Sequence, residues 1–386
     1  MSSQNDYIVF GSPSIGQEEI DEVVDSMRTG WIGTGPKVTR FEESVRAYVG
    51  AQYGVALNSC TAGMHLSLLA FGIGPGDEVI TTPLSFCATA NVIIHAGATP
   101  IFVDVDGATM NIDHALIERA ITPKTKAIMP VHFAGRPCDM DTIMALAKKH
   151  HLLVIEDAAH AIGAEYRGKK IGSIGDATCF SFYVTKNIVT GEGGMVMTNN
   201  EEAAKKIKVY GLHGLSADAW KRYSDEGYKH YDVVFPGFKY NMMDLQAAIG
   251  IQQMKKIDQF YARRKEIWET YKKAFKDLPV GLPDETPTDQ KHALHLFTLL
   301  IDEKTAGIQR DAFMQALHQR GIGSGVHFMP IHLLEYYRKR YGYARGAYPN
   351  TEYIGDRTVS IPLSAKLTDT DVDRIIYAIR EIILSQ

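Results

Sequence analysis

Short apolar runs alternate with longer helical patterns between residues 53 and 199. The strand-like runs are rich in β-branched and aliphatic residues, and they cover 77–82, 99–105, 126–132 and 152–157. A helical pattern over 139–150 separates the last two runs. Near-continuous apolar strands separated by helices are typical of a mostly parallel sheet that helices cover on both faces. The pattern therefore predicts a large α/β domain.

The pattern changes just after Asn241. The segment LQAAIGIQQMKKIDQFYARRKEIWETYKKAF repeats apolar residues at helical spacing, which predicts one long helix or two abutting ones. A polar, proline-containing loop follows, and then a strand-like LHLFTLLID, a helix from Gln309 and an amphipathic helix from Thr368. We therefore predict two domains. Residues 1–240 form the large domain with the N-terminal segment, and residues 241–386 form the long helix and a smaller α+β domain.

Charge and cysteine usage narrow the class of partner. The 386 residues carry 41 Lys and Arg against 45 Asp and Glu, a net charge of -4, so no overall positive field favours nucleic acid. The four cysteines show neither a CxxC pair nor the spacing of a structural zinc site, which fits a reduced cytoplasm and predicts no metal. No apolar run is long enough to span a membrane, and the N-terminus does not read as an export signal. We therefore expect a cytoplasmic protein with a small-molecule partner.

Two segments place polar groups where apolar patterns begin or end. In NSCTAGMHLSLLA, small and hydroxyl residues precede a helical pattern, so free backbone N–H groups and Thr61 could bind a phosphate, although a simple helix cap explains the same pattern. In LLVIED, an apolar strand ends in Glu156 and Asp157, at the edge where open α/β sheets bind ligands. A carboxylate there can hold a pyridine nitrogen protonated, and a helix cap is the alternative reading.

The segment ATCFSFYVTKNIVTGEGGMVMTN carries the strongest chemical signal. It places Lys186 between two apolar strands, after Ser181 and before the loop GEGG. A lysine that loses solvation has a lowered pKa, so its free amine can form an imine with an aldehyde. Most lysines are solvated surface charges, and the surroundings of Lys186 set it apart.

Three motifs together identify a resemblance. DAAHAIGA, SFYVTKNIVTGEGG and PGFKYNMMDLQAAIG occur in the order found in the DegT/DnrJ/EryC1/StrS family of sugar aminotransferases, and the chain resembles that family from about Ile15 to Ile383. The resemblance implies the aspartate aminotransferase type I fold and pyridoxal 5'-phosphate as cofactor. It also implies amino transfer from L-glutamate to a keto group on a nucleotide-linked sugar, in a homodimer with shared active sites.

The resemblance also implies roles for single residues. Lys186 carries the cofactor as a Schiff base and moves the proton, Asp157 pairs with the pyridine nitrogen, and Phe86 stacks on the ring. His160 lies beside the ring. The remaining matched positions bind the cofactor phosphate (Thr61, Ala62 and Ser181) or face the sugar pocket (His327 and His332).

One segment departs from the commoner family pattern. Residues 237–241 read GFKYN where most relatives have arginine at the last position, and this variant is similar to enzymes that make UDP-4-amino-4-deoxy-L-arabinose for lipid A modification. In the family the segment reaches the neighbouring subunit's cofactor phosphate. Either Lys239 or Asn241 could donate there, and we favour Asn241.

Three alternative functions stay open at this point. A sugar dehydratase of the same family has histidine in place of the cofactor lysine, so Lys186 argues against it. A regulatory, non-catalytic member would not need Lys186, Asp157 and Ser181 together. Cysteine desulfurases and threonine aldolases of the same fold need motifs that the sequence does not show. The expected substrate is a UDP-linked 4-keto pentose, with a 4-keto 6-deoxy N-acetylhexosamine as the second choice.

Overall fold

A seven-stranded sheet forms the centre of the molecule. The computed structural model describes residues 7–216 and 232–386, and its main sheet has the strand order β1-β9-β8-β5-β4-β2-β3. The strands are β1 (Tyr53–Leu57), β2 (Glu78–Thr81), β3 (Thr99–Phe102), β4 (Thr125–Ile128), β5 (Leu153–Asp157), β8 (Ala177–Ser181) and β9 (Gly194–Thr198). Within this sheet β9 alone runs antiparallel to both of its neighbours. The prediction of a mostly parallel sheet is confirmed.

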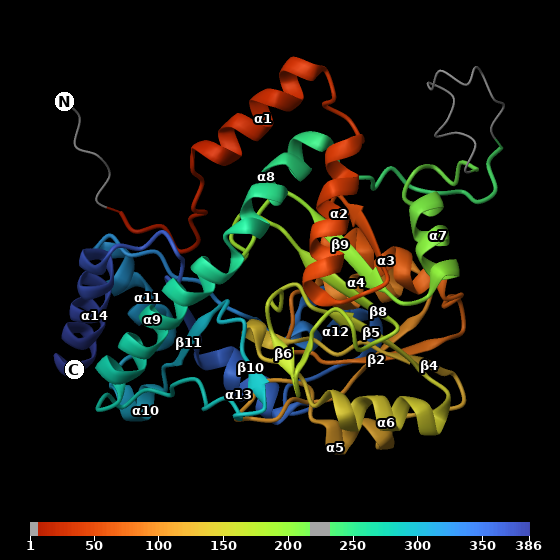
Figure 1. Cartoon of the computed structure of the whole chain (residues 1–386). Coiled ribbons are helices and arrows are strands. Elements are labelled where there is room, and N and C mark those ends of the chain that lie inside the picture. Colours follow the sequence, from red (N-terminus) through yellow and green to blue (C-terminus); the bar gives the residue numbers. More distant parts are fainter. Residues whose placement is uncertain (1–6, 217–231) are drawn as a thin grey trace.

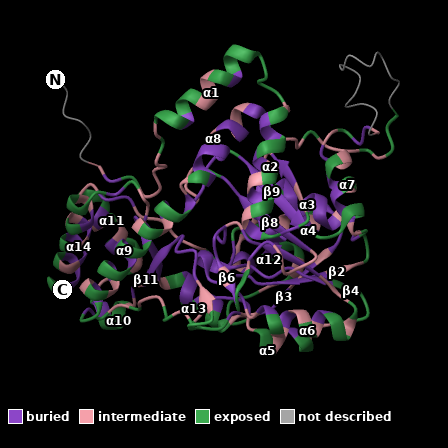
Figure 2. Ribbon diagram, in the orientation of Figure 1, coloured by how far each residue is buried: buried purple, intermediate pink, exposed green. Residues whose placement is uncertain are grey.

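Helices cover both faces of this sheet (Figure 1). One face packs against α3 (Cys60–Ala70), α4 (Ala88–His95) and α7 (Glu201–Tyr210), and the other against α2 (Pro36–Val49), α6 (Met140–His150) and α8 (Asp244–Lys255). Successive strand residues alternate between the two layers, since Val154 and Phe180 belong to one core while Ile155 and Cys179 belong to the other. Two buried faces explain why the strands read as continuous apolar runs (Figure 2).

The predicted run 126–132 is longer than the strand that it forms. β4 ends at Ile128, and Met129 still donates its backbone N–H to the carbonyl of Ile80. Pro130 follows, and a proline has no N–H with which to continue the ladder. The residues up to His132 therefore form a connection that reaches the edge of the sheet.

An N-terminal arm joins the sheet domain through α8. Helix α1 (Gln17–Thr29) lies along α8 (Figure 1), where the buried Glu19 pairs with Lys256 at 2.8 Å and accepts a hydrogen bond from Gln253. Asp244, at the start of α8, is fully buried and caps the start of α2. Its carboxylate accepts three hydrogen bonds, from the N–H groups of Gly35, Lys37 and Val38 at 2.9–3.1 Å.

The C-terminal part has its own core. Two abutting helices, α8 and α9 (Ile257–Phe275), lead to an antiparallel pair, β11 (Phe297–Leu300) and β12 (Thr358–Ile361), which packs with α9, α11 (Arg310–Gln319) and α14 (Asp369–Leu384). The predicted helix pair and the predicted final helix are confirmed. The domain division at residues 240 and 241 stays a prediction.

Shorter elements connect these parts. The short strands are β6 (Glu165–Tyr166), β7 (Lys169–Lys170) and β10 (Gln290–Lys291), and the short helices are α5 (His114–Ile117), α10 (Glu303–Ala306), α12 (Glu335–Tyr341) and α13 (Pro349–Arg357). Across residues 7–216 and 232–386, none of the helices combines the length and apolar character that a membrane span requires.

Candidate active site

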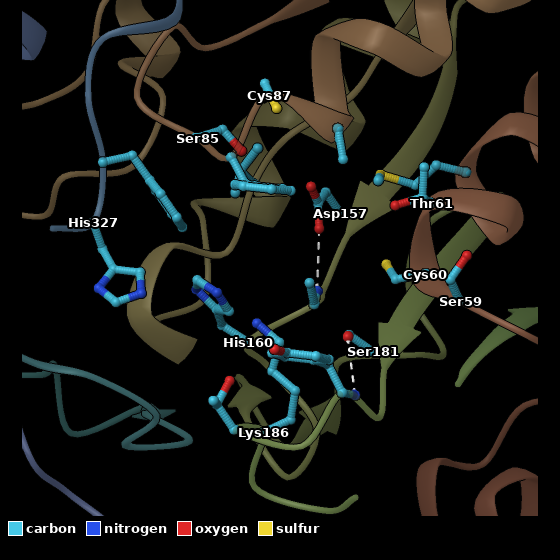
Figure 3. A pocket seen from close by; sticks show the side chains of 18 of the residues that line it. Ser59, Cys60, Thr61, Ser85, Cys87, Asp157, His160, Ser181, Lys186 and His327 are labelled. Carbon is cyan, nitrogen blue, oxygen red and sulfur yellow. Dashed lines mark hydrogen bonds between the residues drawn. The ribbon is translucent and has the colours of Figure 1, made fainter. Parts of the chain in front are cut away.

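A cavity of about 670 Å³ opens at the carboxyl edge of the main sheet. β5 ends there in Asp157, β8 ends there in Ser181, and α3 begins there after β1. The cavity wall includes seven of the residues predicted from the sequence, namely Thr61, Phe86, Asp157, His160, Ser181, Lys186 and His327. Figure 3 shows the side chains of Asp157, His160, Ser181, Lys186 and His327 around the same space. Residues from distant segments thus meet where parallel strands end.

Asp157 is a buried carboxylate at the floor of the cavity. Its Oδ2 accepts a hydrogen bond from the Thr89 hydroxyl at 2.7 Å, and its Oδ1 accepts from the N–H of Ala159 at 3.1 Å. Because the Thr89 proton goes to Asp157, the Ser85 hydroxyl donates in turn to Thr89, also at 2.7 Å. Burial raises the pKa of Asp157, while the hydrogen bond from Thr89 works in the opposite direction. A cation opposite this carboxylate would restore its charged form.

The neighbouring Glu156 points to the other face of the sheet, as the alternation along a strand requires. Its carboxylate accepts hydrogen bonds from Gly175, Thr178 and His132, at 2.9, 2.6 and 2.8 Å. The Nδ1 of His132 accepts the N–H of Cys138, so its Nε2 carries the proton that goes to Glu156. Glu156 is therefore a structural residue that orients His132 in the cavity wall.

Lys186 brings a buried amine into the cavity. It follows the last residues of β8 in a turn in which its own N–H donates to the carbonyl of Tyr183. Burial lowers the pKa of Lys186 to about 8, against the opposing effects of Cys60 and Asp157. A substantial fraction of the amine is uncharged near neutral pH, which is the form that attacks a carbonyl.

The first turn of α3 forms another wall. Ser59 caps the helix, and its hydroxyl accepts the N–H of Ala62 at 3.0 Å. The backbone N–H of Ala62 is therefore already hydrogen-bonded. Ala62 is also buried and does not line the cavity, whereas Thr61 does. Gly194 allows the start of β9 to lie against the first turn of α3, because a Cβ at this position would lie 2.3 Å from the backbone nitrogen of Cys60. Exposed N–H groups at a helix start, with Ser181 nearby, suit an anion.

Aromatic and imidazole rings form the side of the cavity opposite the helix. His160 is buried, and its Nδ1 has no hydrogen-bond partner among residues 7–216 and 232–386. His327 bonds Ser360 at 2.9 Å, and burial lowers the pKa of His327 to about 4. Phe86 is 61% exposed at the mouth, tilted against Phe328 at a ring distance of 6.1 Å. A flat ligand has a free aromatic surface to meet there.

Besides Ala62, two predicted residues lie outside this cavity, His332 and Asn241. His332 is fully buried and bonds Glu352 at 3.0 Å, because Pro330 and the short helix Ile331–Leu333 turn it away from the wall that His327 lines. The structure therefore does not support a substrate contact for His332. Asn241 is held between Thr34, to which its amide donates, and Lys239, from which it accepts, both at 2.6 Å.

Several residues of the site were not found from the sequence. Thr89, Ser85, Tyr183, Glu192 and Met329 belong to this group, and all but Thr89 line the cavity directly. Ser85 and Thr89 flank Phe86 in the segment TTPLSFCATAN, so a hydroxyl residue in an apolar helical pattern was the available signal. The other three lie in loops whose direction no periodic pattern indicates.

The donor set fits pyridoxal 5'-phosphate. A buried amine of lowered pKa can bind the aldehyde, the buried Asp157 carboxylate can pair with a protonated ring nitrogen, and the start of α3 can hold the phosphate. The unpartnered nitrogen of His160 indicates that a polar group is missing from the protein's own contacts.

Comparisons with known proteins agree with this fit. Residues 13–380 match the DegT/DnrJ/EryC1/StrS aminotransferase family. The chain is 53% identical to the uncharacterized protein MJ1066 of Methanocaldococcus jannaschii over 371 residues, 96% of each chain. It is 50% identical to the spore coat polysaccharide biosynthesis protein SpsC of Bacillus subtilis over 384 residues, 99% of each chain.

Solved structures are similar over 98% of the chain. The candidate sugar aminotransferase Spr1654 of Streptococcus pneumoniae, in its PMP form, has a TM-score of 0.92 at 34% identity, covering 98% of this chain and 99% of that one. PseC of Helicobacter pylori, an aminotransferase involved in pseudaminic acid biosynthesis, has a TM-score of 0.90 at 29% identity, covering 98% and 100%. Because the family match covers residues 13–380 and the fold agrees with that of solved aminotransferases, the chain belongs to the DegT/DnrJ/EryC1/StrS family and is a pyridoxal-phosphate-dependent aminotransferase of the type I fold.

Proposed function

We propose that this enzyme transfers an amino group from L-glutamate to the 4-keto group of a UDP-linked sugar, with 2-oxoglutarate as the other product. The observation that carries the proposal is the cavity itself, in which the Lys186 amine lies inside and exposed apolar side chains lie at the mouth. Phe86 and Met329 are 61% and 47% exposed there. Apolar side chains suit the carbon-bound hydrogens of a sugar ring, and a cavity of this size leaves room beyond the cofactor.

The residues divide the chemistry among them. Bound pyridoxal phosphate supplies an electron-withdrawing ring that stabilises negative charge on the substrate carbon. Lys186 Nζ would hold and move the proton at the substrate carbon, and its lowered pKa of about 8 gives a larger free-amine fraction near neutral pH than an ordinary lysine has. Asp157 holds a proton on the ring nitrogen by charge pairing, and the hydrogen bond from Thr89 keeps its Oδ2 in place.

The substrate class rests on relatives and on one variant segment. SpsC is named for spore coat polysaccharide biosynthesis and PseC for the biosynthesis of an acidic sugar. Residues 237–241 read GFKYN, similar to enzymes that act on a UDP-linked 4-keto pentose. These observations support a role in cell-surface polysaccharide or lipid A modification. A UDP-linked 4-keto 6-deoxy N-acetylhexosamine is the second candidate substrate.

A substrate panel tests this proposal. We would measure kcat/KM for UDP-linked and dTDP-linked 4-keto sugars with glutamate held constant. The UDP-linked 4-keto pentose should be preferred, and the 6-deoxy hexosamine should follow within tens to hundreds of fold, because one methyl contact contributes about 1–3 kcal/mol. Activity limited to free amino acids and keto acids would refute the sugar assignment while leaving the cofactor chemistry intact.

We also propose a two-fold homodimer. At the end of α1 and in the loop after it, the side chains of Met27, Trp31 and Ile32 are 65%, 54% and 53% exposed. The same loop contains Thr34, which accepts a hydrogen bond from Asn241. Figure 2 shows that α1 is largely exposed in the single chain. An isologous contact would cover this apolar surface in both copies. Trp31→Asp should shift the mass measured by light scattering from dimer to monomer, and a wild-type monomer with full activity would contradict the proposal.

Two other functions are less well supported. A dehydratase would need a group other than lysine at position 186, and Lys186 lines the cavity. A regulatory protein would have no use for a buried amine next to a buried carboxylate. Turnover of any keto sugar with glutamate would separate the proposed function from both.

A further inference from the structure

The ring of His160 is held by packing alone. It lies between His295, at a centroid distance of 4.5 Å, and Phe328, at 5.9 Å with the two planes 18° apart. Among the residues that the structure describes, no hydrogen bond fixes the His160 side chain, and its Nδ1 is buried without a partner. The orientation of a ring held in this way depends on the rings that pack against it.

His295 is fixed from behind by Asn187. The Asn187 amide nitrogen donates to the carbonyl of Ala293 at 2.8 Å, which leaves Oδ1 facing the Nδ1 of His295 at 3.2 Å. An amide oxygen only accepts, so His295 Nδ1 carries the proton. The backbone N–H of His295 also donates to the carbonyl of Ala134 at 3.0 Å. Both side chains are buried, and His295 does not line the cavity.

Electrostatics agrees with this hydrogen-bond pattern. Burial holds the pKa of His295 well below its usual value, and the charges of Lys186, His327, Arg264 and His292 lower that pKa further. Burial also lowers the pKa of His160, with Lys186, His295 and His327 acting in the same direction. The two rings that face each other are therefore neutral, and neither repels the other or the Lys186 amine.

We propose that Asn187 and His295 are positioning residues of the aminotransferase site, which act through the ring of His160 on the bound cofactor. Asn187 fixes His295, His295 packs on His160, and His160 forms the cavity wall. Asn187 directly follows Lys186, so its bond to Ala293 also ties the turn of the cofactor lysine to the segment that carries His295. The proposal rests on the contact between His160 and the cofactor and is independent of which sugar is the substrate.

The first test introduces a charge behind His295. Asn187→Asp places a carboxylate opposite the Nδ1 proton, which stabilises the imidazolium and raises the pKa of His295. We expect the absorbance of the bound cofactor to gain a pH-dependent step that the wild-type titration lacks. The double variant Asn187→Asp, His295→Phe should lose that step. Identical titrations of wild type and Asn187→Asp would overturn the proposal.

The second test separates packing from hydrogen bonding and remains informative if Asn187→Asp does not fold. His295→Gln keeps a side-chain N–H for Asn187 but removes the ring that packs on His160. Pyridoxal phosphate should bind the cofactor-free variant about tenfold more weakly, with a changed circular dichroism band, while its melting temperature without cofactor is nearly unchanged.

His292→Asn is the matched control, because His292 is a buried imidazole of the same segment that packs on Trp268 and does not line the cavity, and an asparagine oxygen can replace its Nδ1 as acceptor of the Leu294 N–H. It should leave cofactor affinity and the dichroism band unchanged. Equal effects of His295→Gln and His292→Asn, or no effect of His295→Gln, would show that His295 has only a structural role.

Discussion

Thr89, in the first turn of α4, donates a hydrogen bond of 2.7 Å to Asp157 at the end of β5. A hydrogen bond to a buried charged group contributes about 1.5–3 kcal/mol. Thr89→Val keeps the shape of the side chain and removes that donor. We expect kcat to fall about 10- to 100-fold with a smaller change in KM, measured by steady-state kinetics. Thr89→Ser should recover most of the rate, and a Thr89→Val enzyme with normal kcat would exclude this role.

Asp157→Asn tests the carboxylate itself. An uncharged amide cannot hold the ring nitrogen protonated, so turnover should fall by orders of magnitude while the fold is preserved. Substrate binding should change less than the rate. Single-turnover kinetics over a range of glutamate concentrations measures the rate and the binding of substrate, and the melting temperature checks the fold. Normal kinetics in this variant would reduce Asp157 to a structural residue.

Lys186→Ala should abolish turnover and covalent attachment of the cofactor. Both losses follow because the nucleophile and the proton carrier are the same atom. Mass spectrometry after borohydride reduction should find pyridoxyl phosphate on wild-type protein and none on the variant. Lys169→Ala changes an exposed lysine of β7 and serves as the control. Transamination at the wild-type rate by the alanine variant at position 186 would refute the assignment.

The pKa of Lys186 predicts how cofactor loading depends on pH. Burial disfavours the charged ammonium, so its pKa falls to about 8, and the reactive free amine accumulates as pH rises. The rate of covalent attachment to cofactor-free protein should therefore rise about tenfold per pH unit below pH 8 and level off above it. Stopped-flow absorbance provides the measurement. A rate still rising steeply at pH 10 would indicate a lysine of ordinary pKa.

The cap that Asp244 forms predicts a stability effect of a residue that does not line the cavity. Asp244→Ala leaves three backbone N–H groups at the start of α2 without an acceptor, and each such group costs about 1–3 kcal/mol. We expect the free energy of unfolding to fall by about 3 kcal/mol or more in denaturant titration. Asp369→Ala removes an exposed pair with Arg263 and should cost about 1 kcal/mol or less. Similar losses in both variants would contradict the buried-cap interpretation.

Much of the fold was predictable because it depends on local patterns. The run 152–157 forms β5 with Asp157 at its end, since two-sided burial demands continuous apolar residues. The antiparallel direction of β9 was not predictable, because strand direction depends on the connection that returns the chain to the sheet. Likewise Pro130 ends β4 before the apolar run ends.

In the site, too, the residues that belong to local sequence motifs were predictable, and those whose roles depend on long-range contacts were not. Lys186 and Asp157 were found because each adjoins a strand and belongs to a motif, and both line one cavity. Thr89 and His295 were missed because their roles depend on contacts between segments far apart in the sequence. His332 shared a motif with His327, yet the turn after Pro330 sends the two rings to different surroundings.

The helix pair α8 and α9 has a mechanical consequence. Ile251 of α8 belongs to the core of the main sheet, while Trp268 and Tyr271 of α9 belong to the C-terminal core. The two helices therefore contribute side chains to both cores. Unfolding of either core would expose apolar side chains that pack against the other. Proteases should find few cleavage sites along the two helices, and a calorimeter should record one heat-absorption peak rather than two. The two halves of the enzyme are therefore expected to be lost together.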